Sequence, residues 1–275
     1  MEFIDTDLGP ARFEKVRMHG ASLHRVQLND AKLNRVNLSG AEIRGSALYD
    51  MKLIGVEMVN VDIDGQVENV TINGVDVGPL IEAELARRDP LYGQLNPTDA
   101  DGFRAAWAQL EARWSALTER ARELPEELLH ERVAGEWSFI QTLRHLGFAT
   151  AAWLQRVVQN KESPYQPLDI PWDEHPDWPA EWGIPVDHGE RPTLDEALVA
   201  RVARQKAMRQ YLATLTDADL AVSVTREEPG WPAYPDVPVS VALQTVLTEE
   251  YHHHTFATRD LDALTTPTKP TPKEN

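Results

Sequence analysis

Apolar residues recur at every fifth position from Phe13 to Ile63, and a smaller residue, mostly Ala or Val, stands two places before each of them. The eleven central residues of these pentads are Phe13, Met18, Leu23, Leu28, Leu33, Leu38, Ile43, Leu48, Leu53, Met58 and Ile63. A period of five matches neither an α-helix, which repeats every ~3.6 residues, nor a β-strand, which alternates every two. The pattern therefore predicts a solenoid whose coils stack around an apolar axis. The same small-then-large step persists in Val70/Ile72 and Val75/Val77, which predicts a distorted final turn ending near Gly78.

The spacing of apolar residues becomes helical from about Thr98 onward. The first apolar stripe comprises Phe103, Trp107, Leu110, Trp114, Leu117, Ala121 and Leu124. Further helices are predicted over about 137–159, 193–215 and 240–265. Ser138 is the expected N-cap of the second helix, and Thr193 with Glu196 forms a capping-box pattern at the start of the third. Four helices joined with one long crossover predict a four-helix bundle.

Together these patterns predict a chain of β and α parts in more than one domain. The predicted divisions are a solenoid over 1–78, a linker over 79–97, a helical bundle over 98–265 and a tail over 266–275. The tail is rich in Thr and Pro and has no apolar periodicity, so we expect it to be disordered.

Composition narrows the classes of partner. The formal net charge is -17 and the chain contains no cysteine. Binding to nucleic acid or to anionic lipid needs clustered Lys and Arg, so neither partner is expected. A disulfide, a thiolate metal site and a cysteine nucleophile are all excluded. No apolar run approaches the ~20 residues of a membrane span, and the N-terminus carries acids where a signal peptide needs bases, so we expect a cytoplasmic protein.

The fourth predicted helix contains a carboxylate and an imidazole one helical turn apart. Its apolar stripe runs through Leu243, Leu247, Glu250, His254, Ala257, Leu261 and Leu264. Burying an unpaired carboxylate among leucines is costly, and a divalent metal is the strongest compensating partner. Glu249 and His253 have the same spacing on a less apolar face, so Glu250 and His254 are the favoured metal ligands.

A third ligand is expected from the second helix, where His145 follows Leu143 and Arg144. Three protein ligands leave positions open for water or substrate, which is typical of a catalytic metal site. Glu249, His253 and Asp260 are expected beside the ligands, where a carboxylate can orient a ligating imidazole.

The crossover between the second and third helices is dense in Pro and Trp. Two interpretations stay open: a cover over a substrate pocket, or a plain surface loop. In the first, Trp172, Trp178 and Trp182 supply rigid aromatic walls for the pocket.

The sequence resembles two known families. The pentads of residues 11–65 resemble the pentapeptide-repeat family, which implies a short right-handed quadrilateral β-helix. Residues 98–265 resemble the DinB/YfiT-like superfamily through Trp137-Ser138, His145-Leu146, Arg201, Arg204, Glu249-Glu250, His254 and Arg259-Asp260-Leu261. This second resemblance implies a four-helix bundle, often dimeric, that holds zinc or nickel with three side chains from the second and fourth helices.

Several members of that superfamily are transferases or isomerases that use mycothiol, bacillithiol or related thiols, and a glutamate in the ligand pair resembles mycothiol-dependent maleylpyruvate isomerase. The resemblance therefore implies a metal-dependent enzyme that activates an exogenous low-molecular-weight thiol or water toward a small-molecule substrate. The alternative is a non-catalytic protein whose metal staples the bundle and whose repeat module binds a protein partner. No other catalytic residue is identified from the sequence.

Overall fold

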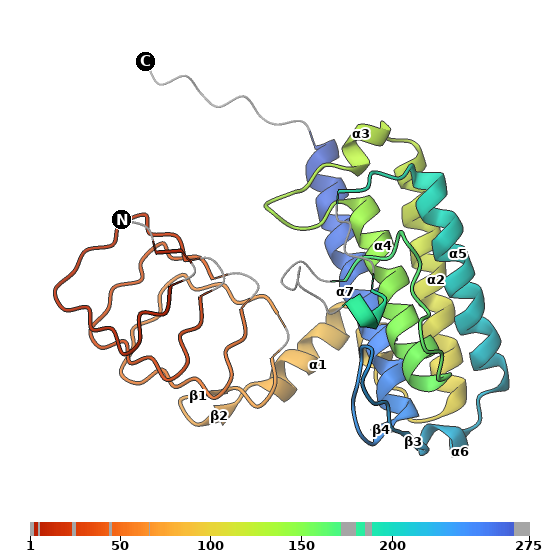
Figure 1. The fold of residues 1–275 in the computed structure, drawn as a ribbon, viewed down its shortest axis with the longest axis horizontal. Helices are drawn as coiled ribbons and strands as arrows, with labels where there is room; N and C mark the ends of the chain where they lie inside the picture. The colour runs from red at the N-terminus through yellow and green to blue at the C-terminus, as the bar shows by residue number, and fades with distance from the viewer. Residues whose placement is uncertain are drawn as a thin grey trace. The chain divides into compact units, whose positions relative to one another are not determined.

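A computed structural model describes residues 3–4, 6–23, 26–43, 46–65, 67–171, 180–184 and 189–266 (Figure 1). The chain divides into two compact units, Met1–Val56 and Glu57–Asn275. None of the helices in these described segments is both long and apolar enough to cross a membrane.

In the first unit the backbone turns at intervals of five residues, in step with the pentads of the sequence. Figure 1 shows this part of the chain winding in successive coils. Positive φ angles recur at residues whose numbers are multiples of five, namely Lys15, Gly20, Asp30, Arg35, Gly40, Asp50 and Gly55. The described residues of 3–65 form no β-ladder, and the eleven central side chains are between 47% and 71% exposed. The quadrilateral β-helix therefore stays a prediction.

A hairpin and a helix open the second unit. Strands β1 (Thr71–Ile72) and β2 (Val75–Asp76) pair antiparallel around Asn73-Gly74, where both residues have positive φ. Asn-Gly favours such two-residue turns because both residues tolerate the left-handed region. Helix α1 (Gly78–Arg88) and the 3₁₀ turn η1 (Tyr92–Gln94) follow.

The C-terminal part of the segment 79–97, which was expected to be a linker, packs against the helical bundle. Leu91 and Leu95 are 1% and 4% exposed and belong to the apolar core of the bundle. Asp89 accepts two hydrogen bonds from Arg113, at 2.6 and 2.7 Å. The packed unit therefore begins before the predicted bound at residue 98.

Four long helices form the bundle, close to the predicted positions (Figure 1). They are α2 (Ala100–Arg122), α4 (Phe139–Thr150) with its π-helical continuation η2 (Ala151–Val158), α5 (Leu194–Thr214) and α7 (Val239–Thr265). Both predicted caps are present: Ser138 forms a capping box with Gln141, and Thr193 forms one with Glu196. Each cap satisfies backbone N–H groups that the first helical turn leaves free.

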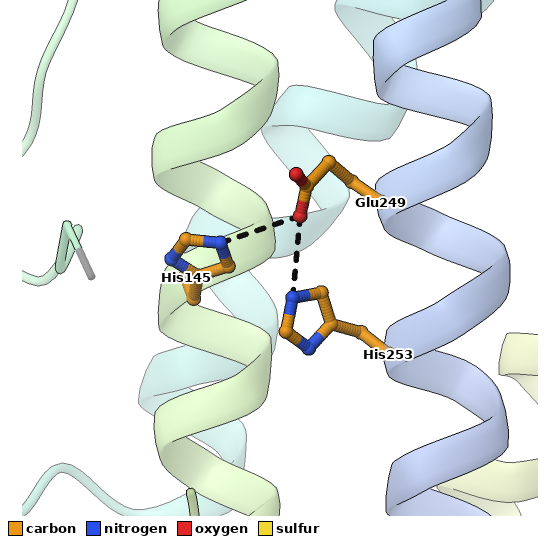
Figure 2. A group of neighbouring side chains, drawn as sticks. All are labelled: His145, Glu249 and His253. Atoms are coloured by element: carbon orange, nitrogen blue, oxygen red, sulfur yellow. Dashed lines mark ion pairs between the residues drawn. The ribbon is translucent and has the colours of Figure 1, made fainter. Parts of the chain in front are cut away.

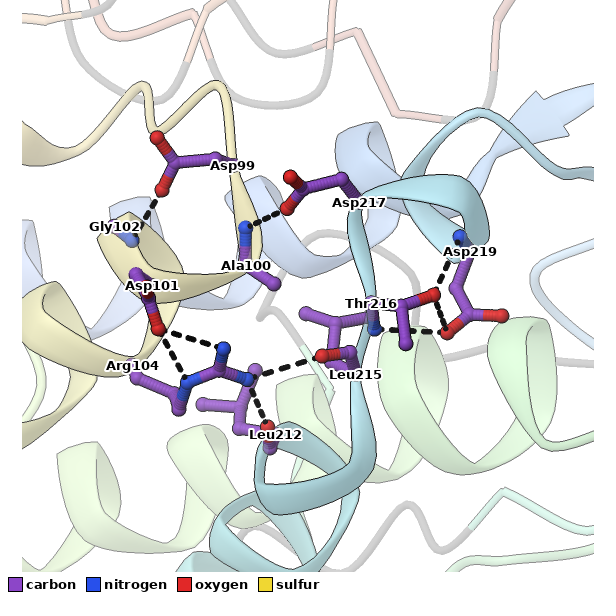
Figure 3. Close-up of polar contacts among 10 residues, drawn as sticks. All are labelled: Asp99, Ala100, Asp101, Gly102, Arg104, Leu212, Leu215, Thr216, Asp217 and Asp219. Atoms are coloured by element: carbon purple, nitrogen blue, oxygen red, sulfur yellow. Dashed lines mark hydrogen bonds and ion pairs between the residues drawn. The ribbon is translucent and has the colours of Figure 1, made fainter.

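Short elements complete the fold. They are α3 (Glu126–Leu129), η3 (Ala180–Trp182), α6 (Asp217–Leu220) and an antiparallel pair of β3 (Ser223–Val224) and β4 (Val237–Pro238). Figure 3 shows how polar contacts fasten α6 and the end of α5 to the start of α2. Asp217 accepts from the backbone N–H of Ala100 at 2.8 Å, and Arg104 donates to the carbonyls of Leu212 and Leu215.

The apolar core has two clusters, one toward each end of the bundle. The first contains Leu110, Leu154, Met208 and Leu247, and the second contains Trp114, Leu143, Leu146, Ala197 and Ala257. On α7 these clusters are separated by the stretch that holds Glu249, Glu250 and the histidines. The polar residues therefore lie where apolar packing is interrupted.

Candidate metal centre

Helices α4 and α7 bring three potential metal ligands together: His145, Glu249 and His253 (Figure 2). Glu249 and His253 are four residues apart on α7, so they share one face of that helix, and His145 reaches them from α4. In the described parts of the chain, this is the one group of three or more His, Asp or Glu side chains placed to hold a metal ion.

The three side chains converge on a small space. Nε2 of His145 lies 3.4 Å from Oε2 of Glu249, and Nε2 of His253 lies 3.2 Å from the same oxygen. One ligand atom from each residue lies within 4.8 Å of the other two. His145 is buried, whereas 18% of the His253 side chain and 33% of the Glu249 side chain are exposed. The cluster therefore has a buried side on α4 and a more accessible side on α7.

Hydrogen bonding determines which nitrogen of His145 is available. Its Nδ1 lies 3.2 Å from the carbonyl oxygen of Ile170, which can only accept, so Nδ1 carries the proton. Burial lowers the pKa of His145, and this favours the neutral ring. A neutral ring with its proton on Nδ1 presents the lone pair of Nε2 to Glu249.

The carboxylate of Glu249 is held in its ionised form. Burial opposes ionisation, but hydrogen bonds and positive charge from His145 and His253, when these rings carry a proton on Nε2, outweigh it and lower the pKa of Glu249 below its ordinary value. An ionised carboxylate facing an imidazole lone pair is repulsive unless a positive charge lies between them. That charge is either a proton on the imidazole or a metal ion.

Aromatic rings cover the imidazoles. The ring centroid of Trp137 lies 4.3 Å from that of His145. The Trp137 ring also stacks on His253, with centroids 5.7 Å apart and an interplanar angle of 16°. The ring centroids of Phe148 and His145 lie 6.1 Å apart, and Phe256 lies edge-on to His253 with centroids 6.0 Å apart. These rings restrict the orientations of both imidazoles and surround them with apolar surface.

The choice of helix face needs correction, because Glu250 and His254 do not join His145. Glu250 is buried as predicted, but its carboxylate accepts from both terminal nitrogens of Arg201, one of them at 2.6 Å. His254 lies edge-on to Trp114, with ring centroids 5.2 Å apart. Residues adjacent in a helix point about 100° apart, so a face that meets α5 and α2 cannot also meet α4.

The sequence did contain a signal for the partner of Glu250. The buried stripe of α5 runs through Leu194, Ala197, Arg201, Arg204, Met208 and Leu212. Two arginines at core positions of an otherwise apolar stripe require buried acceptors. Arg201 binds Glu250, and Arg204 binds Asp169 at 2.5 Å. Glu250 therefore has its counter-charge within the chain and needs no metal.

The remaining predicted site residues have other surroundings. Asp260 is 7% exposed and accepts from Arg259 at 2.7 Å. Trp182 donates from its indole N–H to Glu228 at 2.8 Å. Trp172 and Trp178 lie outside the described residues. The aromatic substrate pocket therefore stays a prediction, and Glu249 and His253, expected beside the ligands, occupy the cluster itself.

The class of this domain is a four-helix bundle with a His/Glu cluster between α4 and α7 that could hold a metal ion. The family model of the DinB superfamily matches residues 109–257, a range that contains all three residues of the cluster, and the chain belongs to this superfamily. No curated protein and no solved structure matches the chain.

Proposed function

We propose that this protein is a divalent-metal-dependent enzyme of the DinB superfamily that activates an exogenous low-molecular-weight thiol, or water, toward an electrophilic small molecule. The observation that carries the proposal is the convergence of three potential ligand atoms, one each from His145, Glu249 and His253, within 4.8 Å of one another. Such a group is stabilised by a cation, and superfamily membership makes a divalent metal the first candidate.

The donor set fits zinc or nickel. Two imidazole nitrogens and one carboxylate oxygen are ligands that both metals accept, and catalytic zinc sites commonly use three protein ligands. A dication held there lowers the pKa of a thiol or a water molecule that binds it. The carboxylate of Glu249 leaves the site with a smaller net positive charge than three histidines would.

Other residues of the chain prepare the site. The carbonyl of Ile170 holds the proton of His145 on Nδ1, so Nε2 is free to bind metal. Trp137 stacks on the ring of His253 and Phe256 lies edge-on to it, so both restrict its orientation. Because the chain contains no cysteine, a thiol nucleophile has to come from a second molecule.

The first experiment is elemental analysis of protein purified without a histidine tag, for the wild type, His253→Ala and His252→Ala. We expect about one zinc or nickel per chain in the wild type and in His252→Ala, and loss in His253→Ala, because His252 is the neighbour that does not join the cluster. Absence of metal from the wild type after reconstitution, or equal metal content in all three proteins, would overturn the assignment.

A second experiment addresses the thiol. Cobalt-substituted protein is titrated with mycothiol, and coordination of sulfur appears as a new charge-transfer absorption. An unchanged spectrum with both mycothiol and simple thiols would contradict thiol activation. It would favour water as the nucleophile or the non-catalytic alternative, in which the metal only stabilises the bundle.

A further inference from the structure

The crossover segment 164–170 is fastened to the bundle by buried arginines. Arg144 on α4 donates to the carbonyl of Leu168 at 2.7 Å and to that of Glu190 at 2.8 Å. Arg144 thereby joins two points of the crossover that are 22 residues apart in the sequence. Its side chain is almost entirely shielded from solvent, with the residue 3% exposed.

A second arginine holds the same segment from α5. Arg204 donates to the carbonyl of Pro164 at 2.9 Å and forms an ion pair with Asp169 at 2.5 Å. Both members of this ion pair are at most 3% exposed. The same carboxylate oxygen of Asp169 accepts from the backbone N–H of Gln166 at 2.8 Å, which closes the segment into a tight turn.

Close packing against α4 leaves this segment little freedom. The other carboxylate oxygen of Asp169 lies over Gly147, where an added Cβ would stand only 2.6 Å away. Gly147 is two residues from His145, on the same helix. The next residue after Asp169 is Ile170, whose carbonyl oxygen accepts a hydrogen bond from Nδ1 of His145.

We infer that Arg144 and the Arg204–Asp169 ion pair are positioning residues of the metal centre. They fix the carbonyl of Ile170 against His145, and this carbonyl keeps the imidazole proton on Nδ1 and the Nε2 lone pair directed at Glu249 and His253. The effect on metal affinity rests on the proposed function, whereas the tautomer of His145 is a property of the metal-free protein. Residues that orient a ligating imidazole in this way typically change metal affinity by about 10–100-fold when they are replaced.

The test compares Arg144→Lys with Arg156→Lys. Arg156 is also buried, at 5% exposure, and donates to the carbonyls of Glu162, Glu227, Pro229 and Pro232, but it has no bond to residues 164–170. Lysine keeps the charge and loses the fork that reaches two carbonyls at once. Zinc affinity is measured by chelator competition, and the tautomer of His145 by nitrogen-15 NMR of metal-free protein.

We expect Arg144→Lys to bind zinc about 10–100-fold more weakly and to lose the pure Nδ1–H tautomer, with Arg156→Lys matching the wild type in both measurements. Equal losses in the two variants, or an unchanged affinity and tautomer in Arg144→Lys, would overturn the inference. If Arg144→Lys does not fold, Gly147→Ala, whose Cβ would stand 2.6 Å from the carboxylate of Asp169 and displace it, is measured in the same way.

The NMR arm separates this inference from the proposed function. If the wild type binds no zinc but His145 is the Nδ1–H tautomer and loses it in Arg144→Lys, the positioning role stands and the metal assignment fails. If the neutral imidazole of His145 in metal-free wild type carries its single proton on Nε2, the positioning role itself is refuted, whatever the zinc affinity.

Discussion

Neutralising Glu249 and Glu250 in turn separates the proposed metal ligand from a structural ion pair. The two residues are adjacent on α7 and differ in partners: Glu249 faces His145 and His253, and Glu250 faces Arg201. Replacement by glutamine keeps the size and removes the charge. The comparison therefore changes one charge at a time, on two faces of the same helical turn.

The expected magnitudes follow from burial. The side chains of Glu250 and Arg201 are 1% and 2% exposed, so Glu250→Gln leaves a guanidinium inside the bundle without a counter-charge. Breaking a buried pair in this way lowers the free energy of unfolding by about 3–5 kcal/mol. The side chain of Glu249 is 33% exposed and its partners are imidazoles, so Glu249→Gln in metal-free protein changes the free energy of unfolding by less than about 1 kcal/mol.

Zinc should stabilise the Glu250→Gln variant but not the Glu249→Gln variant. A ligand at 100 times its Kd stabilises the folded state by about 2.7 kcal/mol. We expect this increment in the wild type and in Glu250→Gln, and we expect it to disappear in Glu249→Gln. Urea unfolding is followed by tryptophan fluorescence, with and without zinc. All eight tryptophans lie between residues 107 and 231, so the signal reports the helical unit alone.

Two results would refute this assignment of the two glutamates. If Glu250→Gln unfolds like the wild type without zinc and loses the zinc increment, Glu250 is the ligand and the face first favoured from the sequence is the correct one. If zinc raises the free energy of unfolding of both variants, neither glutamate binds the metal, and hydrogen bonds from protonated imidazoles hold the cluster together.

Three further predictions concern the stability of the helical unit. Leu91→Ala should lower its free energy of unfolding by about 2–5 kcal/mol, because Leu91 is 1% exposed. Leu80 is 63% exposed, so Leu80→Ala should change the free energy of unfolding by no more than about 0.5 kcal/mol. Equal effects of the two substitutions in the urea assay would place Leu91 outside the core. The hydrogen bonds from Arg113 lower the pKa of Asp89 from 3.8 to about 2, so its contribution is present above about pH 4 and is lost as the pH falls toward 2. Asp89→Asn should therefore cost about 1–2 kcal/mol at neutral pH and little near pH 2, and a pH-independent cost would argue against the ion pair. Ser138→Ala removes the cap of α4 and should cost about 1 kcal/mol in the same assay, so an unchanged midpoint would mean that the capping box contributes nothing.

The positions of the bundle helices could be predicted from the sequence because local rules determine them. Ser138 and Thr193 are followed three residues later by Gln141 and Glu196, and these pairs start α4 and α5 where the capping rule puts them. The contribution of 79–97 could not be predicted in this way. Leu91 and Leu95 are too few and too far from any periodic stripe to reveal that they pack in the core of the bundle.

The ligand set could be predicted only in part, for a geometric reason. The pairs Glu249/His253 and Glu250/His254 have identical spacing, so one sequence pattern fits two helix faces about 100° apart. Apolarity selects the more buried face. That criterion fails here because the most buried carboxylate, Glu250, is neutralised by Arg201 from another helix.

The buried Arg201–Glu250 ion pair and the His145/Glu249/His253 cluster are two consequences of one helix orientation. A bidentate pair between Arg201 and Glu250 fixes the rotation of α7 about its axis, because both side chains are buried and neither can turn toward water. With Glu250 directed at α5, the adjacent Glu249 and the residue one turn later, His253, are directed at His145 on α4. The chemistry that each carboxylate faces then decides its role. Glu250 meets hydrogen-bond donors and forms an ion pair, whereas Glu249 meets an imidazole lone pair and needs a cation between them.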